Sequence, residues 1–199
     1  TGEINMKMLV FYGSYRRDRV GIRFANYVRQ GLADRGHDAE LIDAKAIDLP
    51  MLDRMLKEYP PGEAPPAMAD LAAKIRAADG FVFVIGEYNW GMQPGLKNLT
   101  DHFLEEWFWR PAAIVSYSPG QVGGARAAMA WHPTLSEMGM VVISSTIVLG
   151  SVGEALDANS LPQGKGGEIL DQRFPRFAAD LEWWAAAAAH QRVAHPTPY

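Results

Sequence analysis

The chain has no cysteine. Disulfides, thiolate metal sites and cysteine nucleophiles are therefore excluded, and any redox function needs a bound cofactor. An excess of basic residues is missing too. The 19 Lys and Arg residues face 23 Asp and Glu residues, for a net charge of −4, which argues against a general nucleic-acid-binding protein. The five histidines are scattered without the spacing of metal ligands, so we expect no metal site.

Long hydrophobic runs are also lacking. No segment approaches the roughly 20 apolar residues of a membrane helix, and no basic stretch followed by an apolar run marks a secretory signal at the start. We therefore expect a cytoplasmic protein with no membrane or nucleic-acid partner. The 199 residues, 48% of them hydrophobic, fit one globular domain over 1–199. Within it, 1–6 is expected as an extension and 191–199 as a tail.

Strand and helix patterns alternate along the chain. Apolar runs predict strands at 8–12, 39–42, 81–85, 112–115 and 141–149, and helical spacing predicts helices beginning near residues 22, 66, 96, 125 and 174. We expect the fourth strand to follow a helix that runs from Leu96 to Trp107. This alternation predicts an α/β domain with a doubly wound five-stranded parallel sheet in three layers, α/β/α. A common strand order for such sheets is 2-1-3-4-5.

Two stretches break the alternation, the Pro-rich segment 48–66 and the Gly-rich segment 151–173. Long irregular segments in compact domains are surface loops or functional lids, and the sequence leaves both readings open.

Three unusual loops follow the first, third and fourth expected strands, which are neighbours in this order. The first loop, 13–21, carries Ser14, Arg16, Arg17 and Arg19 just before a helix. Free amides and the helix dipole favour an anion there, and arginine adds contacts to phosphate. A solvated basic turn is the alternative, and we favour phosphate binding.

The other two loops, 86–95 and 116–124, differ in character. The second loop, 86–95, offers aromatic faces and amides from Glu87, Tyr88, Asn89 and Trp90, which suit a flat heteroaromatic ring. Core packing also explains Tyr88 and Trp90 taken alone. The third loop, 116–124, contains Gly120, Gly123 and Gly124, which allow the backbone to approach a ligand closely. Phosphate at one end and a flat ring at the other describe a mononucleotide.

These motifs resemble the NAD(P)H-dependent FMN reductase family, flavodoxin-like flavoproteins that include quinone, azo-dye and chromate reductases. The family pattern Gly-Ser-x-Arg-x-x-Ser-x-Asn is matched at Gly13, Ser14 and Arg16. The second family pattern, Pro-Glu-Tyr-Asn followed by Pro-Gly and Leu-Lys-Asn, is matched at Glu87, Tyr88, Asn89 and 94–98. The resemblance extends from about Met8 to Met140.

The resemblance implies an FMN-dependent oxidoreductase with NADPH or NADH as electron donor. Hydride would pass through flavin N5 in a ping-pong cycle to a flavin, quinone or similar small acceptor, with no obligatory catalytic side chain. It also implies a homodimer or homotetramer. The cofactor-binding residues would be Ser14, Arg16, Arg19, Gly21, Glu87, Tyr88, Asn89, Trp90, Ser116, Gly120, Gly123 and Gly124.

The chain departs from the family pattern at several positions. The second serine of the first loop is Arg19 and its asparagine is Gly21, so two phosphate contacts are missing. The proline before Glu87 is Gly86, and the Pro-Gly pair comes one position late. Two rival functions remain open: a flavodoxin-type electron carrier, and a nucleotide glycosyl-transfer enzyme with Glu87 as nucleophile.

Two further features concern the surface. Trp107, Phe108 and Trp109 are consecutive and cannot all face one core, so we expect Trp107 or Trp109 to contribute to assembly. Arg126 follows the third loop, and we interpret it as an exposed helix arginine rather than as a contact to a dinucleotide phosphate.

Overall fold

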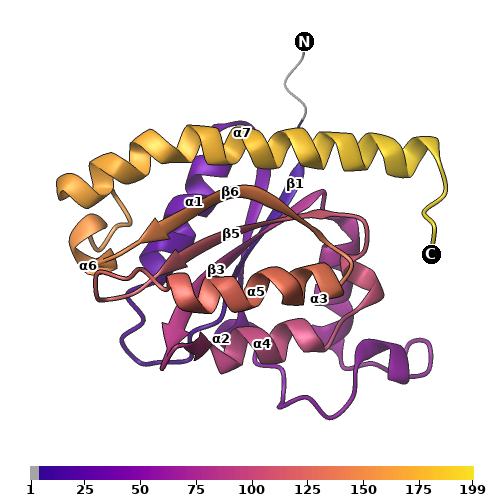
Figure 1. Cartoon of the computed structure of the whole chain (residues 1–199). Helices are drawn as coiled ribbons and strands as arrows, with labels where there is room; N and C mark the ends of the chain where they lie inside the picture. Colours follow the sequence, from indigo (N-terminus) through magenta and orange to yellow (C-terminus); the bar gives the residue numbers. More distant parts are fainter. Residues whose placement is uncertain (1–4) are drawn as a thin grey trace.

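The computed structural model describes residues 5–199, which fold into a central sheet between two layers of helices (Figure 1). Five parallel strands make up the body of the sheet in the order β2-β1-β3-β5-β6. They are β1 (Lys7–Tyr12), β2 (Asp38–Asp43), β3 (Gly80–Tyr88), β5 (Pro111–Tyr117) and β6 (Val141–Leu149), and the two-residue β4 (Gly91–Met92) pairs antiparallel with β3. Counted without β4, this is the expected order 2-1-3-4-5, so the predicted doubly wound sheet is confirmed.

The register of the sheet explains why its central strands are apolar throughout. Val10 of β1 lies beside Val82 of β3, and Val82 beside Ala113 of β5. This row belongs to the core on one face, whereas the next row, with Phe11 and Phe83, belongs to the core on the other face. A strand that is buried on both faces exposes neither face to water, so its sequence does not alternate between apolar and polar residues.

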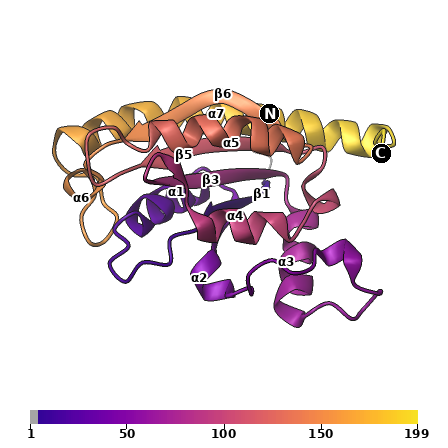
Figure 2. The same ribbon diagram turned by 60° about the horizontal axis from the view of Figure 1, so that its bottom comes forward.

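Helices cover both faces of this sheet. The first core is closed by α1 (Ile22–Asp34) and α7 (Gly164–Ala194), and the second by α3 (Pro66–Ala77), α4 (Pro94–Asp101) and α5 (Ala125–Glu137). Shorter helices are α2 (Ala44–Ile47) and α6 (Val152–Ala155), with 3-10 turns η1 (Leu56–Glu58) and η2 (Glu105–Trp107). Figure 2 shows the connection between α2 and α3 projecting from the body on the side of α4. Within residues 5–199, no helix has the length and apolarity needed to cross a bilayer.

The last helix begins at Gly164, not at Phe174 as expected, so much of the predicted irregular segment 151–173 is helical. The glycines of this segment suggested an irregular loop, but in the structure they allow close packing of the helix. A Cβ on Gly167 would lie 2.8 Å from the carbonyl carbon of Pro162, and one on Gly166 would lie 2.8 Å from the Cβ of Ala155.

The third predicted helix, Leu96 to Trp107, is also wrong in its extent, since the corresponding helix α4 ends at Asp101. Thr100 donates its hydroxyl to the Lys97 carbonyl (3.0 Å), and the His102 ring contacts the Asn98 carbonyl (2.7 Å). Such bonds satisfy carbonyls of the last turn and compete with further helix. Trp107 then turns inward and is fully buried.

Both ends of the described chain belong to the domain. Of the expected extension 1–6, residues 1–4 lie outside the described residues. Met6 is buried, and its carbonyl accepts the Asp38 amide at 3.0 Å. In the expected tail 191–199, α7 continues to Ala194, and Arg192 donates to the Trp109 carbonyl at 2.9 Å.

Candidate functional site

The loops after β1, β3 and β5 meet at the carboxyl edge of the sheet, where doubly wound proteins bind ligands. Two hollows open there and share Arg16 and Tyr88. The smaller, about 130 Å³, is lined by Ser14, Arg16, Asp18, Arg19, Val20, Gly21, Gly86, Glu87, Tyr88, Tyr117, Pro119 and Val152. The larger, about 450 Å³, is lined by Gly13, Tyr15, Arg16, Leu49, Met51, Tyr88, Pro94, Gly95 and Asn98. The sequence-predicted first and second loops therefore come together as expected.

The first loop turns tightly against α4. A Cβ on Gly13 would lie 2.4 Å from the Leu96 amide nitrogen, so only glycine allows this approach. Ser14 is buried, and its hydroxyl lies 2.8 Å from that of Tyr88 in the second loop. Arg16 is exposed at the junction of the two hollows. In the described chain, the amides of residues 17–19 donate to no acceptor, so they are available to an anion.

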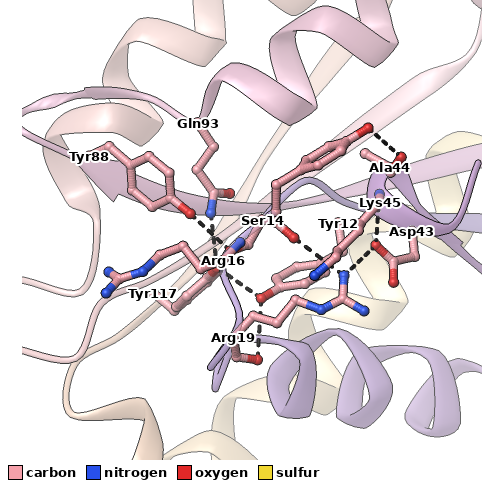
Figure 3. A network of polar contacts seen from close by, with 11 residues as sticks. Tyr12, Ser14, Arg16, Arg19, Asp43, Ala44, Lys45, Tyr88, Gln93 and Tyr117 are labelled. Atoms are coloured by element: carbon pink, nitrogen blue, oxygen red, sulfur yellow. Dashed lines mark hydrogen bonds and ion pairs between the residues drawn. The ribbon is translucent and has the colours of Figure 1, made fainter. Parts of the chain in front are cut away.

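Arg19 lies differently from Arg16. Its guanidinium forms an ion pair with Asp43 at the end of β2 (2.7 Å) and also donates to the Ser14 carbonyl at 3.3 Å (Figure 3). The hydrogen bond to Asp43 raises the pKa of Arg19 above its ordinary value. The side chain therefore braces the first loop against β2, and its charge is largely neutralised.

Four residues that the sequence did not single out line or support the site. Beneath the loops, Tyr12, Gln93 and Tyr117 form a buried polar cluster (Figure 3), and Asp43 holds Arg19. Their position at or just beyond strand ends is the signal that was available, since a buried tyrosine or glutamine there needs a polar partner.

The second loop is a hairpin fastened to the start of α5. The turn residues Asn89 and Trp90 both have positive φ, 48° and 74°, as in a type I′ turn. Glu87 is held inward: its carboxylate accepts the amides of Arg126 and Ala127 at 3.2 and 3.3 Å and forms an ion pair with the Arg126 guanidinium. The negative charge suits the helix N-terminus.

Arg126 completes this arrangement by lying over the ring of Trp90, 4.4 Å from its centroid. The indole is two-thirds exposed and lines neither hollow. Arg126 is therefore paired on two sides rather than being the freely solvated arginine that the sequence suggested.

The third loop approaches the other two through its glycines. Gly123 and Gly124 have φ values of 66° and 75°, and a Cβ on Gly124 would lie 2.6 Å from the Tyr117 carbonyl oxygen. Gly120 is exposed and has open space around it. Nearby, Ser116 is fully buried and its hydroxyl has no partner in the described chain. Buried polar atoms are rarely left unpaired.

The strand order, with its converging loops at one sheet edge, defines a flavodoxin-like α/β protein. Sequence comparison narrows this class, because residues 6–154 match the NADPH-dependent FMN reductases. The chain belongs to that family, and the resemblance drawn from its motifs is confirmed.

Individual relatives agree with this assignment. The NAD(P)H-dependent FMN reductase LOT6 of Saccharomyces cerevisiae is 30% identical over 164 residues, which cover 74% of this chain and 83% of that protein. A quinone reductase of Escherichia coli is 32% identical over 130 residues, 63% of this chain and 65% of that protein. Among solved structures, the flavoenzyme NAD(P)H:(acceptor) oxidoreductase FerB from Paracoccus denitrificans superimposes with a TM-score of 0.73 at 25% identity, covering 89% of this chain and 97% of FerB.

Proposed function

We propose that this protein binds FMN and transfers electrons from NADPH or NADH to a small acceptor such as a quinone. The observation that carries the proposal is the junction at Arg16. There, the free amides of residues 17–19 and an exposed guanidinium lie beside a hollow that continues, past Tyr88, into a more apolar one. The family assignment supports the same activity.

The residues present fit a flavin mononucleotide. Arg16 and the amides of 17–19 would hold its phosphate, since arginine and free backbone amides both favour phosphate oxygens. Ser14, with Tyr88, would contact the chain that joins phosphate and ring. The unpaired hydroxyl of Ser116, with the backbone around Gly120, Gly123 and Gly124, would serve the polar edge of the ring.

Bound FMN would supply the two-electron chemistry that a chain without cysteine cannot perform. The protein's own contribution is binding and orientation. Asn89 and Trp90 form the turn of the hairpin, and Glu87 fixes that hairpin to α5. We assign Glu87 no nucleophilic role, because its carboxylate is already held by two amides and a guanidinium.

The larger hollow is proposed as the place where the acceptor enters. Leu49, Met51 and Pro94 give it an apolar wall, which suits a flat organic acceptor. Asn98 fixes that wall, because its side chain accepts the Leu52 amide at 2.8 Å and donates to the Pro50 carbonyl at 2.9 Å. The segment 48–66 would then form part of the site.

The test is an absorbance titration with FMN followed by anaerobic NADPH and then a quinone. We expect flavin bands that shift on binding, bleach with NADPH and return with the quinone. Binding without bleaching by either nicotinamide cofactor would favour an electron carrier. Absence of FMN binding would contradict the proposal.

We further propose that the protein works as a homodimer or homotetramer. Two neighbouring tryptophans of α7, Trp183 and Trp184, remain 64% and 38% exposed at the surface, with ring centroids 5.0 Å apart. Contiguous exposed apolar surface is typical of contacts between subunits.

A further inference from the structure

A chain of hydrogen bonds connects the three loops, and Figure 3 shows the part of it that runs from Gln93 to Arg19. The Gly86 amide donates to Gln93 Oε1 at 2.9 Å, and Gln93 Nε2 donates to the Tyr117 hydroxyl at 3.0 Å. The Tyr117 hydroxyl donates to that of Tyr12 at 3.3 Å, and Tyr12 donates to the Arg19 carbonyl at 3.4 Å. The chain thus begins in the second loop, passes the end of β5 and ends in the first loop.

The direction of each bond is determined by chemistry. The Gly86 amide has only a proton to give, so Gln93 must turn its oxygen toward Gly86 and its NH₂ toward Tyr117. Each phenol has one proton, and the Arg19 carbonyl can only accept. Burial raises the pKa of both Tyr12 and Tyr117, so both phenols keep the protons that the chain needs.

Three departures from the family pattern meet at this chain. A Cβ on Gly21 would lie 2.0 Å from Tyr117 Cζ, so the ring occupies the space of a side chain at position 21. A Cβ on Gly86 would lie 2.5 Å from Gln93 Nε2, and a proline at position 86 would have no amide proton to donate. Gln93 itself directly precedes the Pro-Gly pair that comes one position late.

We propose that Tyr117 and Gln93 are positioning residues for the phosphate end of the cofactor site. Their bonds connect the second loop to the Arg19 carbonyl and thereby hold the free amides of residues 17–19 in place. The brace, as we call Gly86, Gln93, Tyr117, Tyr12 and the Arg19 carbonyl, compensates for the absent side chain at position 21. This inference rests on the proposed function.

The experiment compares FMN with riboflavin, which has the same ring but no phosphate. Dissociation constants of both flavins are measured by flavin fluorescence for the wild type, Tyr117→Phe and Gln93→Met. Tyr27→Phe is the matched control, because that phenol also donates a hydrogen bond, to Asp171 at 2.8 Å, but lies away from the site. Unfolding in urea is recorded for every variant.

We expect Tyr117→Phe and Gln93→Met to weaken FMN binding about tenfold and riboflavin binding less than threefold, whereas Tyr27→Phe changes neither. Equal losses for the two flavins, or no loss for FMN, would overturn the brace as a positioning device for the phosphate end. If one variant fails to fold, the other carries the comparison. Failure of the wild type to bind FMN would instead overturn the proposed function on which the inference rests.

Discussion

Two arginines of the first loop have different surroundings although they lie only three residues apart. Arg16 is exposed at the junction of the hollows, whereas Arg19 is engaged with Asp43. We expect Arg16→Ala to weaken FMN binding about tenfold, the loss of one charge-assisted contact, and to leave the free energy of unfolding unchanged. Flavin fluorescence titration and urea unfolding measure the two quantities.

Arg17→Ala is the control for this prediction, since Arg17 is also exposed but lines neither hollow. Equal weakening by both substitutions would mean that the general positive charge of the loop, not a contact from Arg16, attracts the ligand.

Glu87 provides a second test on a single side chain. Glu87→Gln keeps the shape but removes the negative charge that Arg126 and the start of α5 share. We expect the free energy of unfolding to fall by about 1 kcal/mol, because Arg126 is partly exposed and the pair is screened, while reductase turnover stays within about twofold of the wild type. Loss of turnover by several orders of magnitude would restore Glu87 as a nucleophile.

The sequence predicted which loops lie together at the edge of the sheet, but not the hydrogen bonds that join them. Ser14 and Arg16 were singled out because phosphate-binding chemistry leaves a mark in local residue types, and Tyr88 because of its aromatic ring and the family motif. Their roles in binding stay predictions. Tyr117 and Gln93 were missed, because their partners are far away in the chain: 105 residues separate Tyr117 from Tyr12. Such pairings depend on the three-dimensional fold, and the spacing of neighbouring residues in the sequence does not predict them.

Polar contacts join the last helix, α7, to the turn between α1 and β2. Glu182 of α7 accepts from Arg35 Nη2 at 2.6 Å and contacts the His37 ring at 2.9 Å. Burial acts to raise the pKa of this carboxyl group, but hydrogen bonds from Arg35 and His37 outweigh burial and lower it. The lowered pKa means that the contribution to stability is present above pH 4.5 and is lost as the pH falls below that value.

We therefore expect Glu182→Gln to lower the free energy of unfolding by about 1 kcal/mol at pH 7, and the difference from the wild type to shrink as the pH falls below 4.5. Urea unfolding as a function of pH measures this. Glu168→Gln on the same helix is the control, because Glu168 is exposed and forms no ion pair among residues 5–199. A difference that does not shrink below pH 4.5 would contradict the assignment to charge.

The elements themselves were predictable where one local pattern dominated. The buried runs of β1 and β3 and the apolar face of α1 were recognised because burial on two faces, or on one helical face, shapes composition directly. The start of α7 was not, since Gly166 and Gly167 are there for contact with α6 and Pro162. Glycine that serves packing is indistinguishable in sequence from glycine that ends a helix.

In the molecule as a whole, some tryptophans are buried in the core and others are exposed at the surface. We expected Trp107 or Trp109 to contribute to a subunit contact. Trp107 is fully buried and packs 5.2 Å from the Phe81 ring and 5.3 Å from the Phe11 ring, measured between centroids. That expectation is wrong for Trp107, because its indole fills the centre of the second core. Trp109 instead lies 4.7 Å from the ring of Tyr199 and donates its indole N–H to the Tyr199 carbonyl at 3.1 Å.

We expect Trp107→Ala to lower the free energy of unfolding by about 3 to 5 kcal/mol, and Trp183→Ala to change it by less than about 0.5 kcal/mol. If the homodimer or homotetramer forms through the exposed face of α7, Trp183→Ala lowers the mass measured by light scattering. An unchanged mass would place the subunit contact elsewhere.

The brace also has a consequence for how these positions can change during evolution. Tyr117 leaves no room for a side chain at position 21, and Gln93 leaves none at position 86 and needs an amide proton there. A lineage that moves between this arrangement and the family pattern by single substitutions passes through a steric clash or an unfilled space at each step. The four positions should therefore change as a block, and relatives with tyrosine at position 117 should carry glycine at both 21 and 86.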